Sequence, residues 1–162
     1  MSPNDPSASP ALTAGLAVEG AAWQALLNVM GEEERALVDG EADRLGPLNA
    51  SKLTQLQALG SLARARHDGL QAVGHTPDQA GMEAWLSRYG QPEHRASWQQ
   101  LCGLEQLARA RNERIGVLID MRLSATRQAL NVLVHAATSH HGLYDQAGQS
   151  VAASQGKPLA AA

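Results

Sequence analysis

Residues 101–137, LCGLEQLARARNERIGVLIDMRLSATRQALNVLVHAA, carry the pattern that decides the fold. Apolar residues recur along this stretch at helical spacing, from Leu101 to Ala137, which are 36 positions apart. About ten turns over that distance give 3.6 residues per turn, which is the repeat of a straight α-helix and not the 3.5-residue repeat of a coiled coil. The stripe consists of Leu101, Leu104, Ala108, Ile115, Ile119, Leu123, Leu130, Leu133 and Ala137. We therefore expect one long helix that begins at Pro92-Glu93, ends near His140 and is about 70 Å long.

The composition of the whole chain also favours helices. Its 162 residues include 29 alanines and 22 leucines, whereas Val, Ile and Thr together number 15 and Phe is absent. Sheets favour β-branched and aromatic side chains, while Ala and Leu lose little conformational freedom in a helix. We therefore predict an all-α fold.

Two helices of intermediate length should precede the long one. The first is expected to begin near Ala17 and to end at Gly40, because glycine suits the left-handed position that follows a helix. The second carries leucines at helical spacing up to Gly74. It contains Gly46-Pro47, and proline is tolerated in the first turn of a helix but not in its interior. We therefore expect this helix to start at Gly46-Pro47.

A short helix should connect these two to the long one. In Thr76-Pro77-Asp78-Gln79 we expect Thr76 to cap the helix, Pro77 to be its first residue and Gln79 to complete the capping box. Gly90 should end it. The predicted architecture is an elongated helical bundle over residues 16–141, with two antiparallel helices, a short connecting helix and one long C-terminal helix.

Both ends of the chain have the composition of disordered segments. Residues 1–15 contain three prolines among Ser, Asn and Ala, with few apolar anchors. Residues 142–162 are rich in Gly, Ser, Ala and Gln. Because such segments bury too little apolar surface to offset the entropy of ordering, we expect a disordered N-terminal arm and a flexible C-terminal tail.

Charge and cysteine content exclude several classes of protein. The net charge is −3, whereas a nucleic-acid-binding protein should show a basic stripe and a membrane anchor a polybasic segment. No apolar run approaches the roughly 18 residues of a membrane span, and the N-terminus lacks the pattern of a secretory signal. The only cysteine, Cys102, cannot form an intrachain disulfide. We expect a soluble, cytoplasmic protein.

No residue pattern predicts catalysis, a cofactor or a metal site. His140 and His141 are adjacent and therefore point about 100° apart on a helix, whereas metal ligands on one helix need a spacing of three or four residues. Glu32-Glu33-Glu34 is expected to form a solvated face. The sequence Leu-Ala-Arg-Ala-Arg occurs at 62–66 and at 107–111, but arginines two positions apart face different sides of a helix. We therefore expect no enzyme, no cofactor and no metal.

The second half of the long helix is unusually apolar. One packing neighbour needs an apolar stripe of about 100°, and residues 115–137 offer about twice that width. The polar residues are confined to about a third of the circumference: Asp120, Ser124, Arg127, Gln128, Asn131 and His135. Either the first two helices both cover this region, or it accepts an amphipathic helix from a partner. The pattern alone does not separate these alternatives.

Several segments, in this order and spacing, resemble the flagellar export chaperones of the FlgN family. They are ALVDGE at 36–41, RARNERIGVLI at 109–119, LYDQAGQ at 143–149 and LAAA at 159–162. The resemblance covers the chain from about Ala21 to the C-terminus. In the family pattern Asn-x-x-Asn-Gly-x-Leu-Ile, Asn112 and Gly116 are kept here, but Ile115 replaces the second Asn.

This resemblance implies a non-enzymatic cytoplasmic chaperone. Its clients would be the C-terminal helices of the hook–filament junction proteins of the FlgK and FlgL type, which it would keep unassembled and deliver to the export apparatus. The implied partners there are an export gate of the FlhA type and, as a further candidate, the export ATPase. The chaperone itself is expected to be a monomer or a homodimer that binds neither nucleic acid nor membrane.

The resemblance also implies two functional regions. Client binding is expected on the long helix, at Asn112, Ile115, Leu118, Ile119, Arg122, Leu123, Leu130 and Leu133. Tyr144, in the turn that follows this helix, is expected to dock on the export gate. The alternative is a self-associating helical adaptor without an export client, in which the apolar half of the long helix pairs with a second copy.

Overall fold

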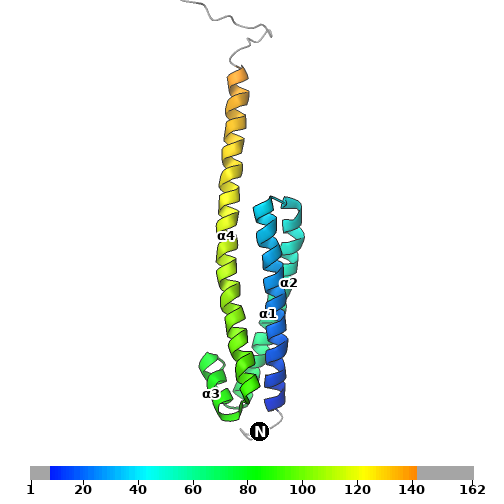
Figure 1. Ribbon diagram of the computed structural model, residues 1–162, viewed down its shortest axis with the longest axis vertical. Coiled ribbons are helices and arrows are strands. Elements are labelled where there is room, and N and C mark those ends of the chain that lie inside the picture. Colours follow the sequence, from blue (N-terminus) through cyan, green and yellow to red (C-terminus); the bar gives the residue numbers. More distant parts are fainter. Residues whose placement is uncertain (1–7, 142–162) are drawn as a thin grey trace, which may run out of the picture. The chain divides into compact units, whose positions relative to one another are not determined.

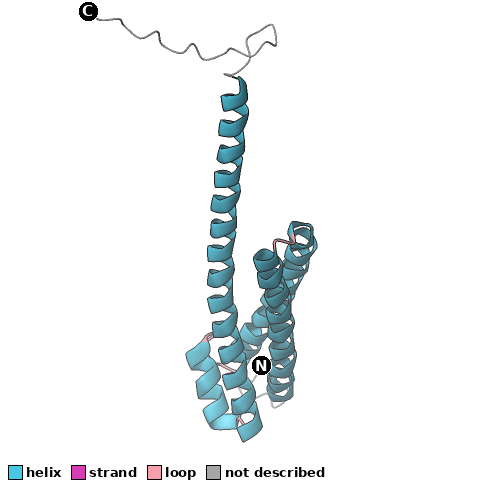
Figure 2. Cartoon of the chain, turned by 45° about the horizontal axis from the view of Figure 1, so that its top comes forward, coloured by secondary structure: helices cyan, strands magenta, loops and turns pink. Residues whose placement is uncertain are grey.

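The protein folds into four α-helices. A computed structural model describes the backbone of residues 8–141 and the side chains of residues 11–139. The helices are α1 (Ala8–Asp39), α2 (Ala42–Ala72), α3 (Gln79–Tyr89) and α4 (Pro92–His141) (Figure 1). No residue within 8–141 lies in a strand, so the predicted all-α class is confirmed (Figure 2). The chain divides into two units, Met1–Ile119 and Asp120–Ala162, and the division falls within α4.

Helices α1 and α2 lie side by side and run antiparallel (Figure 1). Two ion pairs show how α1 and α2 are aligned: Glu19 pairs with Arg66, and Glu33 pairs with Lys52. A step of 14 residues up α1, from 19 to 33, matches a step of 14 residues down α2, from 66 to 52. The predicted antiparallel pair is confirmed.

Helix α1 begins earlier than the sequence suggested. Residues 8–15, which we assigned to a disordered arm, form its first two turns, and residues 1–7 lie outside the described part of the chain. Pro10 is compatible with this start because the first N–H groups of a helix have no partner within it. The physical reason for the longer helix is burial, since Leu12 and Leu16 are 5% and 1% exposed in the core.

Glycines end α1 and α2 as predicted. Gly40 and Gly74 have φ angles of 77° and 80°, in the left-handed region that favours glycine. The next residue folds back in each case: the N–H of Glu41 donates to the Ala36 carbonyl, and that of His75 to the Leu70 carbonyl. Both ends are therefore Schellman motifs, which satisfy carbonyls that would otherwise lack a partner.

The predicted starts of α2 and α3 need correction. Helix α2 begins at Ala42, so Pro47 lies inside it. The missing N–H of Pro47 leaves the carbonyl of Asp43 without its helical donor, which is tolerated because Asp43 is exposed to water. Helix α3 is capped by Asp78 and not by Thr76, since the Asp78 carboxylate accepts a 2.7 Å hydrogen bond from the N–H of Gly81.

Helix α3 requires a glycine where its first turn meets the preceding loop. A Cβ atom at Gly81 would lie 1.9 Å from the Thr76 carbonyl oxygen. Thr76 itself donates a 2.7 Å hydrogen bond to the Asp78 carboxylate. The loop and the cap thus form one compact unit that turns the chain from α2 into α3.

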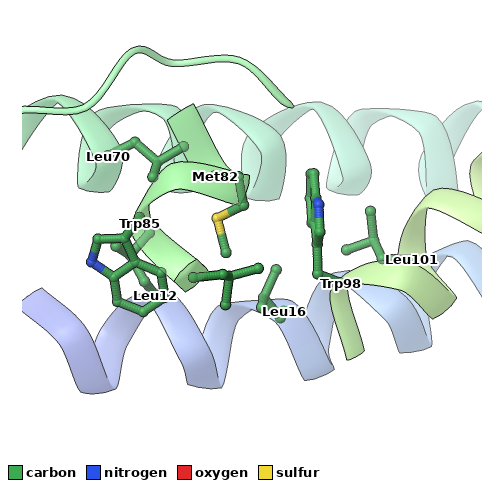
Figure 3. Packing of buried hydrophobic residues seen from close by; sticks show 8 residues of the cluster. Leu12, Leu16, Leu70, Met82, Trp85, Trp98 and Leu101 are labelled. Carbon is green, nitrogen blue, oxygen red and sulfur yellow. The ribbon is translucent and has the colours of Figure 1, made fainter. Parts of the chain in front are cut away.

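A first core cluster joins all four helices (Figure 3). Its Trp85 and Met82, both of α3, are 2% and 0% exposed. The Trp98 ring of α4 packs in the same cluster, and the Arg66 guanidinium lies 5.0 Å from its centroid. The buried members are Leu12, Leu16, Leu70, Met82, Trp85, Leu86, Trp98 and Leu101.

A second core cluster joins α1, α2 and the first half of α4. Its buried members are Leu26, Leu27, Met30, Leu37, Leu59, Ala108 and Ile115. Charged residues lie at its border: Glu33, expected on a solvated face, is 7% exposed and its carboxylate lies 2.9 Å from the Lys52 ammonium. On α4, Arg111 donates a 2.9 Å hydrogen bond to the Leu27 carbonyl, and Arg114 lies 3.1 Å from the carboxylate of Glu34.

The repeated Leu-Ala-Arg-Ala-Arg sequence has a structural role in both copies. Its last arginine is Arg66 in α2 and Arg111 in α4. Arg66 pairs with Glu19 of α1, and the Nε atom of Arg111 lies 3.7 Å from Glu34, also of α1. Each copy thus attaches one helix to α1 through a partly buried ion pair.

Candidate functional site

The apolar stripe of α4 is buried within the first unit. Leu101, Ala108 and Ile115 are 1%, 4% and 1% exposed, and Leu104 packs against them. They follow one another at intervals of seven residues, which is close to two helical turns. This part of the stripe therefore belongs to the core and leaves little apolar surface for a partner.

The second unit, described by itself over residues 120–141, has the opposite character. Every side chain from Asp120 to Ser139 is exposed. Four of the large apolar ones lie within an arc of about 100° at 3.6 residues per turn, the width that one packed helix covers. We call these four residues the leucine face: Leu123, Leu130, Leu133 and Val134.

The leucine face is exposed to a degree that is unusual for side chains of this kind. Leu130 is 58% exposed and Leu133 67%. Two further apolar side chains, Met121 and Val132, are 63% and 67% exposed on another side of the helix. Contiguous apolar surface of this kind in a monomer typically marks an interaction site.

Few charges accompany these apolar residues. Between 120 and 139 the charged side chains are Asp120, Arg122 and Arg127, with His135 as a further titratable group. Arg122 and Arg127 lie about 20° outside the two edges of the leucine face. An apolar centre flanked by charged side chains is the pattern of surfaces that recognise amphipathic helices.

The client residues implied by the resemblance fall into two groups. Ile115 is in the core, and Leu118 is half-buried and packs against the same cluster. Ile119, at the end of the first unit, is 39% exposed. Arg122, together with Leu123, Leu130 and Leu133 of the leucine face, is exposed in the second unit.

Burial explains the residue that departs from the family pattern. Ile115 replaces an asparagine of that pattern and is 1% exposed among Leu26, Leu27 and Ala108. An aliphatic side chain contributes apolar burial there, whereas a buried amide would need hydrogen-bond partners. We therefore assign Ile115 to the core.

Asn112 belongs to the first unit. It is exposed and lines a pocket of about 220 Å³ together with Trp23, Leu26, Met30 and Leu56. The indole nitrogen of Trp23 is buried without a hydrogen-bond partner. Asn112 therefore borders the second core cluster of the first unit.

Three further residues bear on the candidate site: Tyr144, Met121 and Val132. Tyr144, expected at the export gate, lies outside the described residues. Met121 and Val132 were part of the apolar circumference in the sequence, but they were not singled out as binding residues. Their helical positions, about 100° or more from the leucine face, show that they lie on another side of α4.

The described chain offers little to catalysis. Between residues 8 and 141, no group of three His, Cys, Asp or Glu side chains could hold a metal ion. Burial raises the pKa of the Cys102 thiol, which packs against the first core cluster as a small apolar residue. Among the helices of this region, none has the length and hydropathy needed to cross a bilayer.

Comparison with protein families decides the classification. The model of the family described as FlgN protein matches residues 1–152. The chain belongs to the FlgN family. No curated protein and no solved structure matches it. FlgN proteins are flagellar export chaperones, a class of proteins that bind clients, which agrees with the exposed apolar face on α4.

Proposed function

We propose that this FlgN protein is a cytoplasmic chaperone for the hook–filament junction proteins of the FlgK and FlgL type. It binds their C-terminal helices on the leucine face, prevents their premature assembly and delivers them to the export apparatus. The observation that carries this proposal is the exposure of Leu123, Leu130 and Leu133 on a helix whose earlier turns bury their apolar side.

The chemistry of the second unit supports helix binding. Proteins that recognise amphipathic helices do so through apolar side chains at helical spacing, which bury the apolar stripe of the partner. Junction proteins polymerise through terminal helices that are unpaired before assembly, so covering such a helix is sufficient to keep it from assembling. This activity needs no ATP and no cofactor, because binding alone shifts the client towards its unassembled state.

Delivery requires a second contact, with an export gate of the FlhA type. We assign it to Tyr144, because the resemblance places a docking tyrosine in the turn that follows the last helix. The export ATPase is a further candidate partner. Separate sites for client and gate would allow the chaperone to hold its client while it docks.

The second candidate function is a self-associating adaptor. The same exposure of Leu130 and Leu133 favours it, since a second copy could cover the leucine face. The two functions differ in mass and in the response to a client. The chaperone forms a complex with the junction-protein segment, whereas the adaptor forms a dimer that does not change when the segment is added.

Size-exclusion chromatography with light scattering distinguishes them. The full chain is run alone and with a C-terminal segment of the cognate junction protein. The segment is added at the same molar concentration as the chain and at twice that concentration. We expect a new species whose mass is the sum of chaperone and segment. A constant dimer mass under all conditions would favour the adaptor. The variant Leu130→Glu should not form this complex. Leu107→Glu, which alters an exposed leucine of α4 in the first unit, is its matched control and should still form it.

A further inference from the structure

The packing of α4 against the core ends within the first unit. Its last residues in contact with the second core cluster are Ile115, which is buried, and Leu118, which is half-buried. From Asp120 to Ser139 every side chain is exposed, so no buried side chain anchors this stretch of the helix. In proteins most of the stability of a helix comes from the packing of its apolar face. Residues 120–139 therefore depend on their own helix propensity.

That propensity is modest. Asp, Asn, His, Ser, Thr and Val favour a helix less than Ala, Leu, Arg and Gln do. Six residues of this weaker group lie in the last nine positions of the stretch, so each further turn of helix gains less towards the C-terminal end. The nine such residues between 120 and 139 are Asp120, Ser124, Thr126, Asn131, Val132, Val134, His135, Thr138 and Ser139.

Hydroxyl groups of this stretch also bond the backbone of their own helix. The Thr126 hydroxyl donates a 2.9 Å hydrogen bond to the Arg122 carbonyl. Thr138 and Ser139 both donate to the His135 carbonyl, at 3.0 and 2.7 Å. Such bonds address carbonyls that serve the helical ladder, and they slightly destabilise a helix. The last turns of the stretch are therefore the first to open.

We propose that residues 120–139 exchange between helix and coil in the free chaperone, and that a bound client helix shifts this equilibrium to the complete helix. The inference rests on the proposed function and adds how the affinity of the leucine face is set. The four residues of that face share one side of the chain only while the segment is helical. When the competent state is partly populated, the apparent dissociation constant rises in inverse proportion to its population. Helix propensity at positions away from the face thus controls client affinity.

Amide hydrogen exchange of the free chain tests the equilibrium itself. We expect the amides of residues 120–139 to exchange about 100-fold faster than those of residues 101–115 of the same helix, because opening there breaks no core contact. Adding the cognate junction-protein segment should slow the exchange of residues 120–139. Equal protection of the two stretches in the free chain would overturn the inference.

Substitutions on the side of α4 away from the leucine face test the coupling to client binding. Gln128, Ser124 and His135 are exposed and lie about 80° or more outside that face. Gln128→Gly lowers helix propensity and should weaken client binding about threefold. Ser124→Ala combined with His135→Ala raises helix propensity and should tighten binding about threefold. The tightening is decisive, because a general disturbance of the structure would only weaken binding.

Gln106→Gly is the matched control for Gln128→Gly. Gln106 is also an exposed glutamine of α4, but it lies in the first unit, where Leu101 and Ala108 anchor the helix in the core. This variant should leave client affinity unchanged, although it lowers the propensity of the same helix by the same substitution. Equal weakening by Gln106→Gly and Gln128→Gly would contradict the coupling.

The outcomes separate this inference from the proposed function, because the exchange measurement on the free chain needs no client. Protected amides together with tight client binding would leave the chaperone function standing and overturn the inference. The same affinity in the native chain and in all variants would overturn the coupling. Rapid exchange without binding of any junction-protein segment would confirm the helix–coil equilibrium but overturn both the client assignment and the coupling.

Discussion

The Arg66 guanidinium donates two hydrogen bonds to the carboxylate of Glu19, with N–O distances of 2.9 and 3.2 Å. The Glu19 side chain is 3% exposed and that of Arg66 13%, so the pair is largely removed from water. The guanidinium also lies over the ring of Trp98. One arginine of α2 thus connects α1 to α4 at the edge of the first core cluster.

Removing one partner of this ion pair should lower the free energy of unfolding. Glu19→Ala leaves a desolvated arginine without its carboxylate, and we expect the free energy of unfolding to fall by about 3 kcal/mol. Urea denaturation followed by circular dichroism measures this. Glu105→Ala is the control, because it removes a pair whose arginine, Arg109, is 72% exposed, and should cost less than about 1 kcal/mol. Equal losses in the two variants would contradict the structural role of Glu19.

Stability also distinguishes the core part of the α4 stripe from its exposed part. Ile115→Ala removes methyl groups from the second core cluster and should cost about 2–4 kcal/mol. Leu130→Ala, at a side chain that is 58% exposed, should change the free energy of unfolding by less than about 0.5 kcal/mol. Urea denaturation of both variants tests this. A large loss in Leu130→Ala would show that this leucine is packed in the free protein.

The cap of α3 makes a pH-dependent contribution. Hydrogen bonds from the Gly81 N–H and the Thr76 hydroxyl lower the pKa of Asp78. The unfolded chain binds this proton more readily, so the stabilisation is complete above the ordinary Asp pKa of about 3.9 and is lost as the pH falls through the folded-state pKa.

Thermal unfolding of Asp78→Ala checks this effect between neutral pH and about pH 2. The variant should have a lower Tm than the natural chain at pH 7, and the difference should diminish below about pH 4. Asp68→Ala, at an exposed position of α2, is the control for the loss of one carboxylate from the chain. A Tm difference for Asp78→Ala that persists unchanged in acid would mean that the charge of the cap contributes nothing.

Tyr144 provides a test of delivery that is independent of client binding. Tyr144→Ala should leave the affinity for junction-protein segments unchanged but reduce the amount of junction protein exported by cells. Export is measured by immunoblotting of culture supernatants. If the variant instead binds the segments more weakly, the turn belongs to the client site and not to the gate contact.

Local signals in the sequence were sufficient for most of the fold. Gly40 and Gly74 end their helices as predicted, because a positive φ angle is a local requirement that glycine meets. The start of α4 followed from Pro92-Glu93, and its length followed from the period of its apolar stripe. Composition, helix-ending glycines and the period of the apolar residues are all properties of neighbouring residues, which is why they can be read without the structure.

Two of the errors arose where tertiary contacts decide. Leu12 and Leu16 are isolated leucines among small and polar residues, and only their burial in the first core cluster, with residues of α2, α3 and α4, explains why α1 begins at Ala8. Glu33 looked like one of three solvated glutamates, but Lys52 of α2 pairs with it. The sequence contains no local sign of either contact.

The candidate site was only partly predictable for the same reason. Helical spacing identified an apolar stripe that includes Ile115 and Leu130, and both have the same character in the sequence. Whether such a residue is buried depends on the helices that cover it: Ile115 is 1% exposed and Leu130 58%. Leu118→Glu would therefore also disturb packing, whereas Leu130→Glu alters the exposed face alone.

Isothermal titration of the full chain with the C-terminal segments of the cognate junction proteins tests the central claim most directly. We expect saturable binding at micromolar or lower concentration, with a negative heat-capacity change from apolar burial. Leu130→Glu should abolish this binding, and Leu107→Glu should leave it intact. No heat from well-folded protein with either segment, or full binding by Leu130→Glu, would contradict the assignment of the leucine face as the client site.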